Sequence, residues 1–89
     1  MTELVLVRAA DEPTLVAELA RLVAFLDRVP EVALADVAYT CSRGTGPAVL
    51  AVIADDVPSL RARLASARDR LGGGTVKRIR DKSGTYYAR

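Results

Sequence analysis

The sequence predicts a small α+β domain, in which a three-stranded, mainly antiparallel sheet carries two to three helices packed on one face. The order of elements is β-α-α-β-α-β, with a hairpin at the end. Two aliphatic runs, residues 3–8 and 48–54, are typical of strands, and leucine-rich stretches at helical spacing lie between and after them. Because 89 residues provide only one modest core, residues 1–89 are expected to form a single domain.

The first half of the chain predicts a strand over residues 3–8 and then two helices. Asp11-Glu12-Pro13 has the acidic cap and early proline of a helix start. The helix that follows carries an apolar stripe and ends before Pro30. A shorter helix is expected over Leu34–Cys41, and the segment 42–47, with two glycines and a proline, ends it.

The second half predicts a strand, a helix and a hairpin. Residues 48–54 are apolar without interruption, which indicates a central strand that is covered on both faces, or shielded on the second face by a neighbour. A third helix begins near Asp55-Asp56-Val57-Pro58 and ends at the glycines 72–74. Residues 75–80 and 85–88 flank a four-residue turn and are expected to pair.

Composition and charge narrow the classes of function. No apolar run approaches the roughly 20 residues of a membrane helix, no basic region precedes the first apolar run, and the single Cys41 fits a reducing cytoplasm. Residues 1–57 carry four bases against nine acids, a net charge of −5, whereas residues 58–89 carry nine against two, a net charge of +7. The basic hairpin, Lys77–Arg89, is the best nucleic-acid candidate. However, Tyr86 and Tyr87 are adjacent and must point to opposite faces of a strand, so they cannot form one stacking platform.

The sequence offers no set of catalytic residues. It contains no histidine and only one cysteine, Cys41, which we interpret as a small hydrophobic side chain of the short helix. The adjacent Asp55 and Asp56 are explained as helix caps. The glycines at 44–46 and 72–74 follow helices, which is the wrong order for a nucleotide-binding loop. We therefore predict no catalytic, cofactor-binding or metal-binding residue and no cofactor.

The segment Leu34-Ala35-Asp36-Val37-Ala38-Tyr39-Thr40 resembles the L-x-D-V-A-Y-T block of the linker domain between ketosynthase and acyltransferase in modular and iterative type I polyketide synthases. The aliphatic run 48–54, the acidic pair and leucine-rich helix after it, and the closing segment 79–88 are similar to that linker in the same order. The loop differs from the usual pattern, because Arg43 precedes Gly44 and Pro47 stands immediately before the strand.

The resemblance implies a non-catalytic scaffold of polyketide biosynthesis. Its implied partners are the adjacent ketosynthase and acyltransferase domains. The Ala- and Arg-rich, Lys-poor composition separately suggests a bacterial gene, and the single cysteine a cytoplasmic protein. The residues themselves predict no membrane partner and disfavour nucleic acid. Two alternatives stay open: a free-standing ferredoxin-like or ACT-like module that binds a small ligand at a strand–helix junction, and, less favoured, nucleic-acid binding through the basic hairpin.

Overall fold

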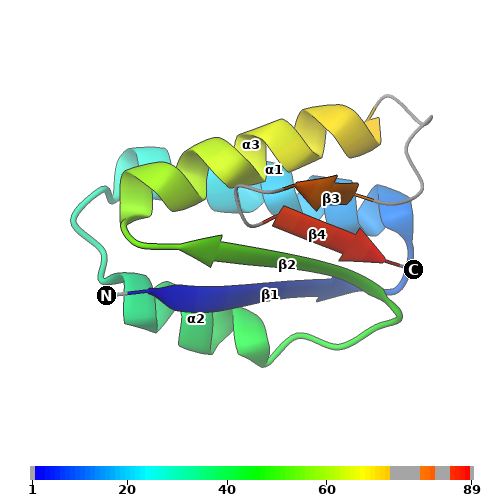
Figure 1. The fold of residues 1–89 in the computed structure, drawn as a ribbon, viewed down its shortest axis with the longest axis horizontal. Helices are drawn as coiled ribbons and strands as arrows, with labels where there is room; N and C mark the ends of the chain where they lie inside the picture. The colour runs from blue at the N-terminus through cyan, green and yellow to red at the C-terminus, as the bar shows by residue number, and fades with distance from the viewer. Residues whose placement is uncertain (1, 73–78, 82–84, 89) are drawn as a thin grey trace.

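The computed structural model describes residues 2–72, 79–81 and 85–88. In chain order the elements are β1 (Glu3–Ala9), α1 (Glu12–Arg28), α2 (Leu34–Ser42), β2 (Ala48–Ala54), α3 (Val57–Gly72), β3 (Ile79–Asp81) and β4 (Thr85–Ala88). The α+β class and the expected order are confirmed (Figure 1). The boundaries of β2 agree with the prediction. The first part of the expected hairpin, residues 75–78, lies outside the described residues.

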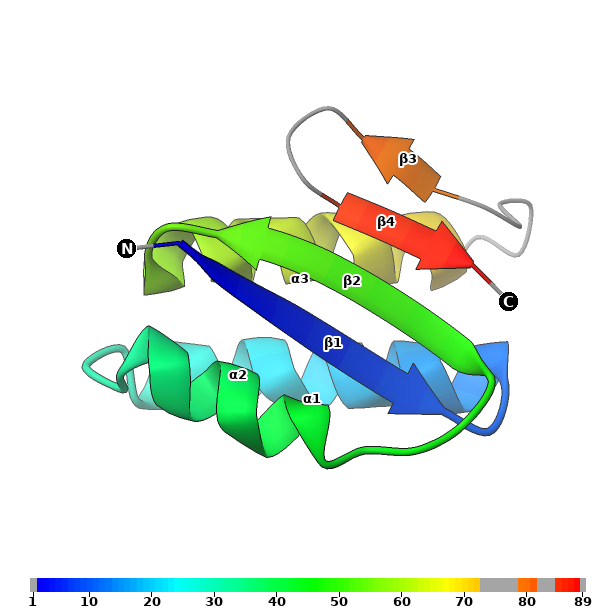
Figure 2. The ribbon, with the colours of Figure 1, turned by 60° about the horizontal axis from the view of Figure 1, so that its bottom comes forward.

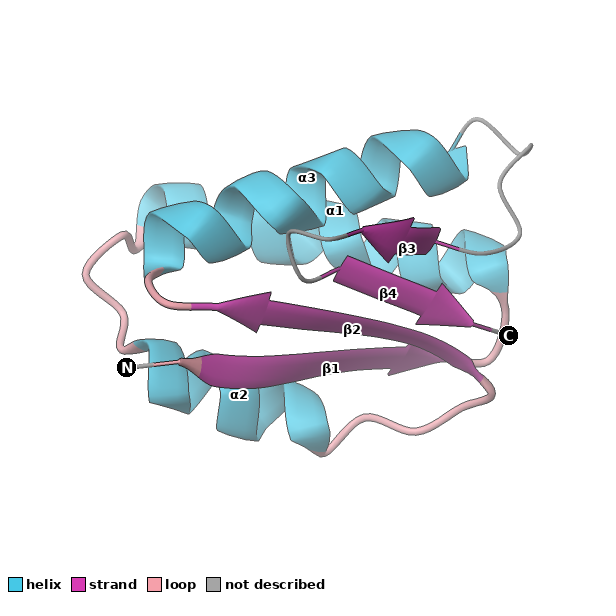
Figure 3. Ribbon diagram, in the orientation of Figure 1, coloured by secondary structure: helices cyan, strands magenta, loops and turns pink. Residues whose placement is uncertain are grey.

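The strands form one antiparallel sheet in the order β1-β2-β4-β3. β1, β2 and β4 make the expected three-stranded unit, and the short β3 extends it by one strand because it pairs with β4 (Figure 3). Strand β2 pairs with β1 on one side and with β4 on the other. Val52 of β2 lies opposite Val5 of β1, and Leu50 of β2 lies opposite Tyr87 of β4. Since paired residues of an antiparallel sheet point to the same side, this register decides which side chains share a face.

The two long helices, α1 and α3, cover one face of the sheet and pack against each other (Figures 1 and 2). Their apolar stripes meet the alternate residues of the strands, as the helical spacing predicts. The resulting core is aliphatic apart from one aromatic ring. It includes Val5, Val7, Leu15, Leu19, Val23, Leu26, Leu50, Val52, Leu60, Leu64, Leu71 and Tyr87.

The short helix α2 lies along the outer edge of β1 (Figure 2). It buries Val37 and Ala38. The loop from α2 to β2 passes close to the end of β1 at Gly46, whose φ is +133°. A Cβ at this position would collide with the backbone carbonyl group of Ala9, so only glycine fits.

Helix starts follow the predicted caps. Asp11 is the N-cap of α1, and its carboxylate accepts a hydrogen bond from the backbone N–H of Thr14 at 2.9 Å. Asp56 does the same for α3, accepting from the backbone N–H of Ser59 at 2.7 Å. Each cap satisfies a backbone N–H that has no partner within the helix. None of the described helices is long and apolar enough to cross a bilayer.

Candidate interaction surfaces

The face of the sheet that α1 and α3 do not cover is apolar. The register places Leu4 opposite Ile53 and Leu6 opposite Ala51, and these residues alternate with the buried ones. Leu4 is 53% exposed, Ile53 38% and, on β4, Tyr86 45%. We call this surface the open sheet face and define it by six residues: Leu4, Leu6, Val49, Ala51, Ile53 and Tyr86.

The composition of the open sheet face departs from that of an ordinary half-exposed sheet. Antiparallel sheets with one face in water usually alternate apolar residues inside with polar residues outside. On β1 and β2, the outward positions are instead apolar except Arg8, which lies opposite Val49 near one end of the strands. The sequence predicts that β2 is covered on both faces, or shielded on the second. In the described part of the chain, α1 and α3 cover only one of these faces. The same composition suits a face that another surface covers.

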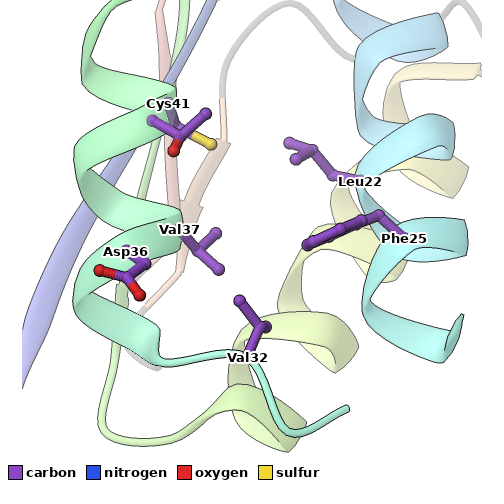
Figure 4. Close-up of a pocket in the computed structure, with 7 residues that line it drawn as sticks. Leu22, Phe25, Val32, Asp36, Val37 and Cys41 are labelled. Carbon is purple, nitrogen blue, oxygen red and sulfur yellow. The ribbon is translucent and has the colours of Figure 1, made fainter. Parts of the chain in front are cut away.

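A second apolar surface is the groove between α1 and α2 (Figure 4). Leu22 and Phe25 point into it from α1, Val37 and Cys41 from α2, and Val32 from the connecting loop. The groove has a volume of about 240 Å³ and is open to solvent along one side. It exists because α2 packs on the edge of β1 rather than directly on α1.

Cys41 is partly buried in this groove, in agreement with its interpretation as a small hydrophobic side chain. Burial raises the pKa of its thiol above the ordinary value, because the thiolate would lose hydration there. A raised pKa reduces the thiolate fraction at neutral pH, and the thiolate is the nucleophilic form. The environment therefore does not activate Cys41.

A wider hollow of about 410 Å³ lies at the junction of β1 and α1, also bordered by α2 and the loop after it. Its polar side chains include Arg8, Thr14, Glu18 and Thr45. The hollow lies at a strand–helix junction, the kind of place at which the alternative module is expected to bind a small ligand. The hollow is about as open to solvent as the groove between α1 and α2.

The two adjacent carboxylates have separate structural partners. Asp56 caps α3, and hydrogen bonding from Ser59 lowers the pKa of its carboxyl group below the ordinary value. Asp55 accepts a hydrogen bond from the hydroxyl of Thr2 at 2.6 Å, so the expectation that both residues cap the helix is wrong for Asp55. The pair shows no shared arrangement of the kind that acid–base catalysis needs. Within residues 2–72, 79–81 and 85–88, no group of three or more potential metal ligands gathers.

Three arginines on α3, in the basic second half of the chain, have partners within the domain. Arg61 makes two hydrogen bonds with Asp27 of α1, at 3.0 and 3.1 Å, and these lower the pKa of that carboxyl group. Arg63 donates to the carbonyl of Ile53, and Arg68 pairs with Asp69. These contacts occupy side chains that an anion-binding face would need free.

The hairpin has the arrangement of tyrosines that its sequence predicts. Tyr86 is exposed on the open sheet face, whereas Tyr87 is only 2% exposed and packs in the core. They point to opposite faces, so they form no joint platform for stacked bases. The basic residues Lys77, Arg78, Lys82 and Arg89, and the glycines 73–74, lie outside the described residues.

No protein-family model matches this chain, and no curated protein is significantly similar to it. Among the solved structures that match, the chain is similar to part of the crystal structure of the acyltransferase domain of the iterative polyketide synthase in enediyne biosynthesis. The two share 30% sequence identity with a TM-score of 0.82, over 98% of this chain and 24% of that chain. This chain thus spans about a quarter of the solved chain. The match is consistent with the resemblance to the linker between ketosynthase and acyltransferase.

Proposed function

We propose that this domain is the non-catalytic structural linker of a bacterial, cytoplasmic polyketide synthase, where it positions the ketosynthase and acyltransferase domains relative to each other. The observation that carries the proposal is the structural match, which includes nearly every residue of this chain within a larger acyltransferase-domain structure. The D-V-A-Y-T block, which lies on α2, is the sequence motif that supports the proposal.

The surfaces of the domain support a role in contact with other domains. The open sheet face and the α1–α2 groove are both apolar and both accessible. Exposed apolar side chains that adjoin one another, rather than lie singly, provide a surface on which another protein can pack. Asp11 and Asp56 instead cap helices of the fold itself. Arg61 pairs with Asp27 between α1 and α3.

The mechanism of such a domain is geometric. The folded domain extends 33 × 24 × 19 Å, and its helices are joined by the Arg61–Asp27 pair and the shared core. A folded spacer holds two neighbours at one separation, whereas a flexible chain of the same length samples many. The fixed separation would limit the distance over which a tethered acyl group must travel between the two catalytic domains.

The proposal is tested in a polypeptide that joins a ketosynthase and an acyltransferase through this chain. Replacing the chain by a Gly/Ser segment of equal length should leave each catalytic activity measurable. It should also broaden the interdomain distance distribution in small-angle scattering and slow the overall condensation. Equal distance distributions and equal condensation rates with the two linkers would contradict a positioning role.

The hollow at the β1–α1 junction favours the second candidate, a module that binds a small ligand. Binding to the folded state would raise the melting temperature with ligand concentration. A screen of amino acids and nucleotides by thermal shift, with Thr14→Val and Glu18→Gln as variants in the hollow, tests it. A ligand whose effect disappears in both variants would support this function over the scaffold.

A further inference from the structure

We propose that the open sheet face is the surface that docks on the acyltransferase domain; this inference rests on the proposed linker function. The face consists of neighbouring side chains from three strands, with Leu4 and Ile53 paired across β1 and β2 and Tyr86 beside Ala51 on β4. Its centre is aliphatic, and the charged Arg8 lies toward one end.

The chemistry of the face specifies a flat apolar surface as its occupant. Antiparallel sheets bury a second face by packing another sheet or a helix layer about 10 Å away. The aliphatic positions provide no charge to recognise an ionic ligand, and they are not hollowed into one of the pockets described above. Tyr86 has a hydroxyl group on an apolar ring, a combination that suits the margin of a protein–protein contact.

The size of the face indicates a partner that is held nearby by a covalent connection. A large apolar or aromatic side chain presents roughly 200 Å² when fully exposed. Leu4, Ile53 and Tyr86 are 53%, 38% and 45% exposed, so together they offer on the order of 250 Å². A stable complex between free proteins buries about 800 Å² on each partner. A second copy of this chain would therefore gain too little from this face alone. A domain in the same polypeptide needs a much smaller contact area, because its effective concentration is in the millimolar range.

The structural match favours the acyltransferase over the ketosynthase as that partner. The matched region belongs to a structure of an acyltransferase domain and includes 98% of this chain, so all three strands that form the face lie within the matched length. About three quarters of the solved chain lies outside the region that corresponds to this domain. That remainder supplies the probe for the experiment.

The test measures whether the face becomes inaccessible beside an acyltransferase. In a chimera, this chain replaces the matched quarter of the enediyne acyltransferase-domain protein, with Cys41→Ala to remove the native thiol. One version carries Ile53→Cys on the open sheet face. The control carries Tyr39→Cys on α2, where the native residue is 67% exposed. Alkylation rates with N-ethylmaleimide, measured under denaturing conditions as a reference, are compared between the chimera and the isolated 89-residue chain.

We expect the cysteine at position 53 to react at least tenfold more slowly in the chimera, and the cysteine at position 39 to change by less than twofold. Protection at position 39 without protection at 53 would overturn the assignment of this face and leave the linker function standing. Protection at neither position would overturn both the docking face and the contact with an acyltransferase. Dimerisation of the isolated chain that Ile53→Lys abolishes would assign the face to self-association instead.

A second measurement decides the question if the chimera does not fold. The isotopically labelled 89-residue chain is titrated with the remaining three quarters of the acyltransferase-domain protein at near-millimolar concentration. Selective broadening of the methyl signals of Leu4, Leu6 and Ile53 is expected. Broadening confined to α2, or no broadening at all, would overturn the proposal.

Discussion

The two faces of the sheet are built from nearly the same aliphatic residues but have opposite surroundings. On one face, Val5, Leu50 and Val52 are completely buried under α1 and α3. On the other, Leu4 and Ile53 remain exposed. The comparison teaches that the hydrophobicity of a strand does not by itself show which of its two faces is buried within its own domain. One face stabilises the fold, and the other is available for contact with a neighbouring domain.

The largest expected difference between the faces comes from removing one leucine side chain on each. Leu50→Ala should lower the free energy of unfolding by about 2–5 kcal/mol, because it leaves a cavity under the helices. Leu4→Ala, at a residue 53% exposed, should change it by less than about 1 kcal/mol. Urea unfolding of the isolated chain measures both. Equal losses would mean that the open sheet face is packed within the domain itself.

The covered region extends to the edge of the sheet, where Gly46 brings the loop after α2 against β1. Gly46→Ala should cost about 1–3 kcal/mol for its backbone conformation, and the contact with the Ala9 carbonyl should add to this cost. Gly44→Ala is the matched control, since its Cβ would lie 3.4 Å from the nearest atom, the carbonyl oxygen of Cys41. Thermal unfolding compares them. A tolerated Gly46→Ala would show that the loop can move away from Ala9 at little cost.

A smaller effect is expected at the start of the helix layer. Asp11→Ala removes the hydrogen bond to the Thr14 backbone and should cost about 1 kcal/mol. Asp11→Asn keeps an acceptor and should recover most of that loss. Thermal unfolding at pH 7 measures the two variants. An Asn variant as unstable as the Ala variant would point to the carboxylate charge rather than to the cap.

The smallest expected effect is the pH dependence of stability that comes from exposed carboxylates on the helices. Arg61 holds the pKa of Asp27 below its ordinary 3.8, as the Ser59 amide does for Asp56. A lowered folded-state pKa stabilises the protein fully above the ordinary value, and this contribution is lost as the pH falls below it. Urea midpoints should therefore be level from pH 7 to 5 and decline below pH 4. Asp27→Asn should make this decline of the urea midpoint less steep. Arg61→Met should have the same effect, because it removes the partner of Asp27.

The sequence predicted the elements well where local chemistry decides them. The caps at Asp11 and Asp56, the aliphatic run of β2 and the opposite placement of Tyr86 and Tyr87 all depend on near neighbours in the chain. The open sheet face could not be predicted in the same way. In β2 every residue from 48 to 54 is apolar, so the pattern contains no alternation to distinguish the covered side from the exposed one.

The groove between α1 and α2 was missed for a related reason. The periodicity of Leu22 and Phe25, and of Val37 and Cys41, shows that each helix has an apolar face. It does not show that these faces meet across a gap, because that depends on α2 lying at the edge of β1. Asp55 is similar: its bond to Thr2 joins residues far apart in the chain, whereas adjacency to Asp56 suggested a local cap.

The position of α2 also has a consequence for association through strand pairing. β1 is an edge strand of seven residues, and long free edges add strands from other molecules and grow into fibres. With α2 alongside that edge, the other end of the sheet is β3, a strand of only three residues. Within the described residues, the domain therefore presents an apolar sheet face to a neighbour without a long free strand edge that could template amyloid-like growth.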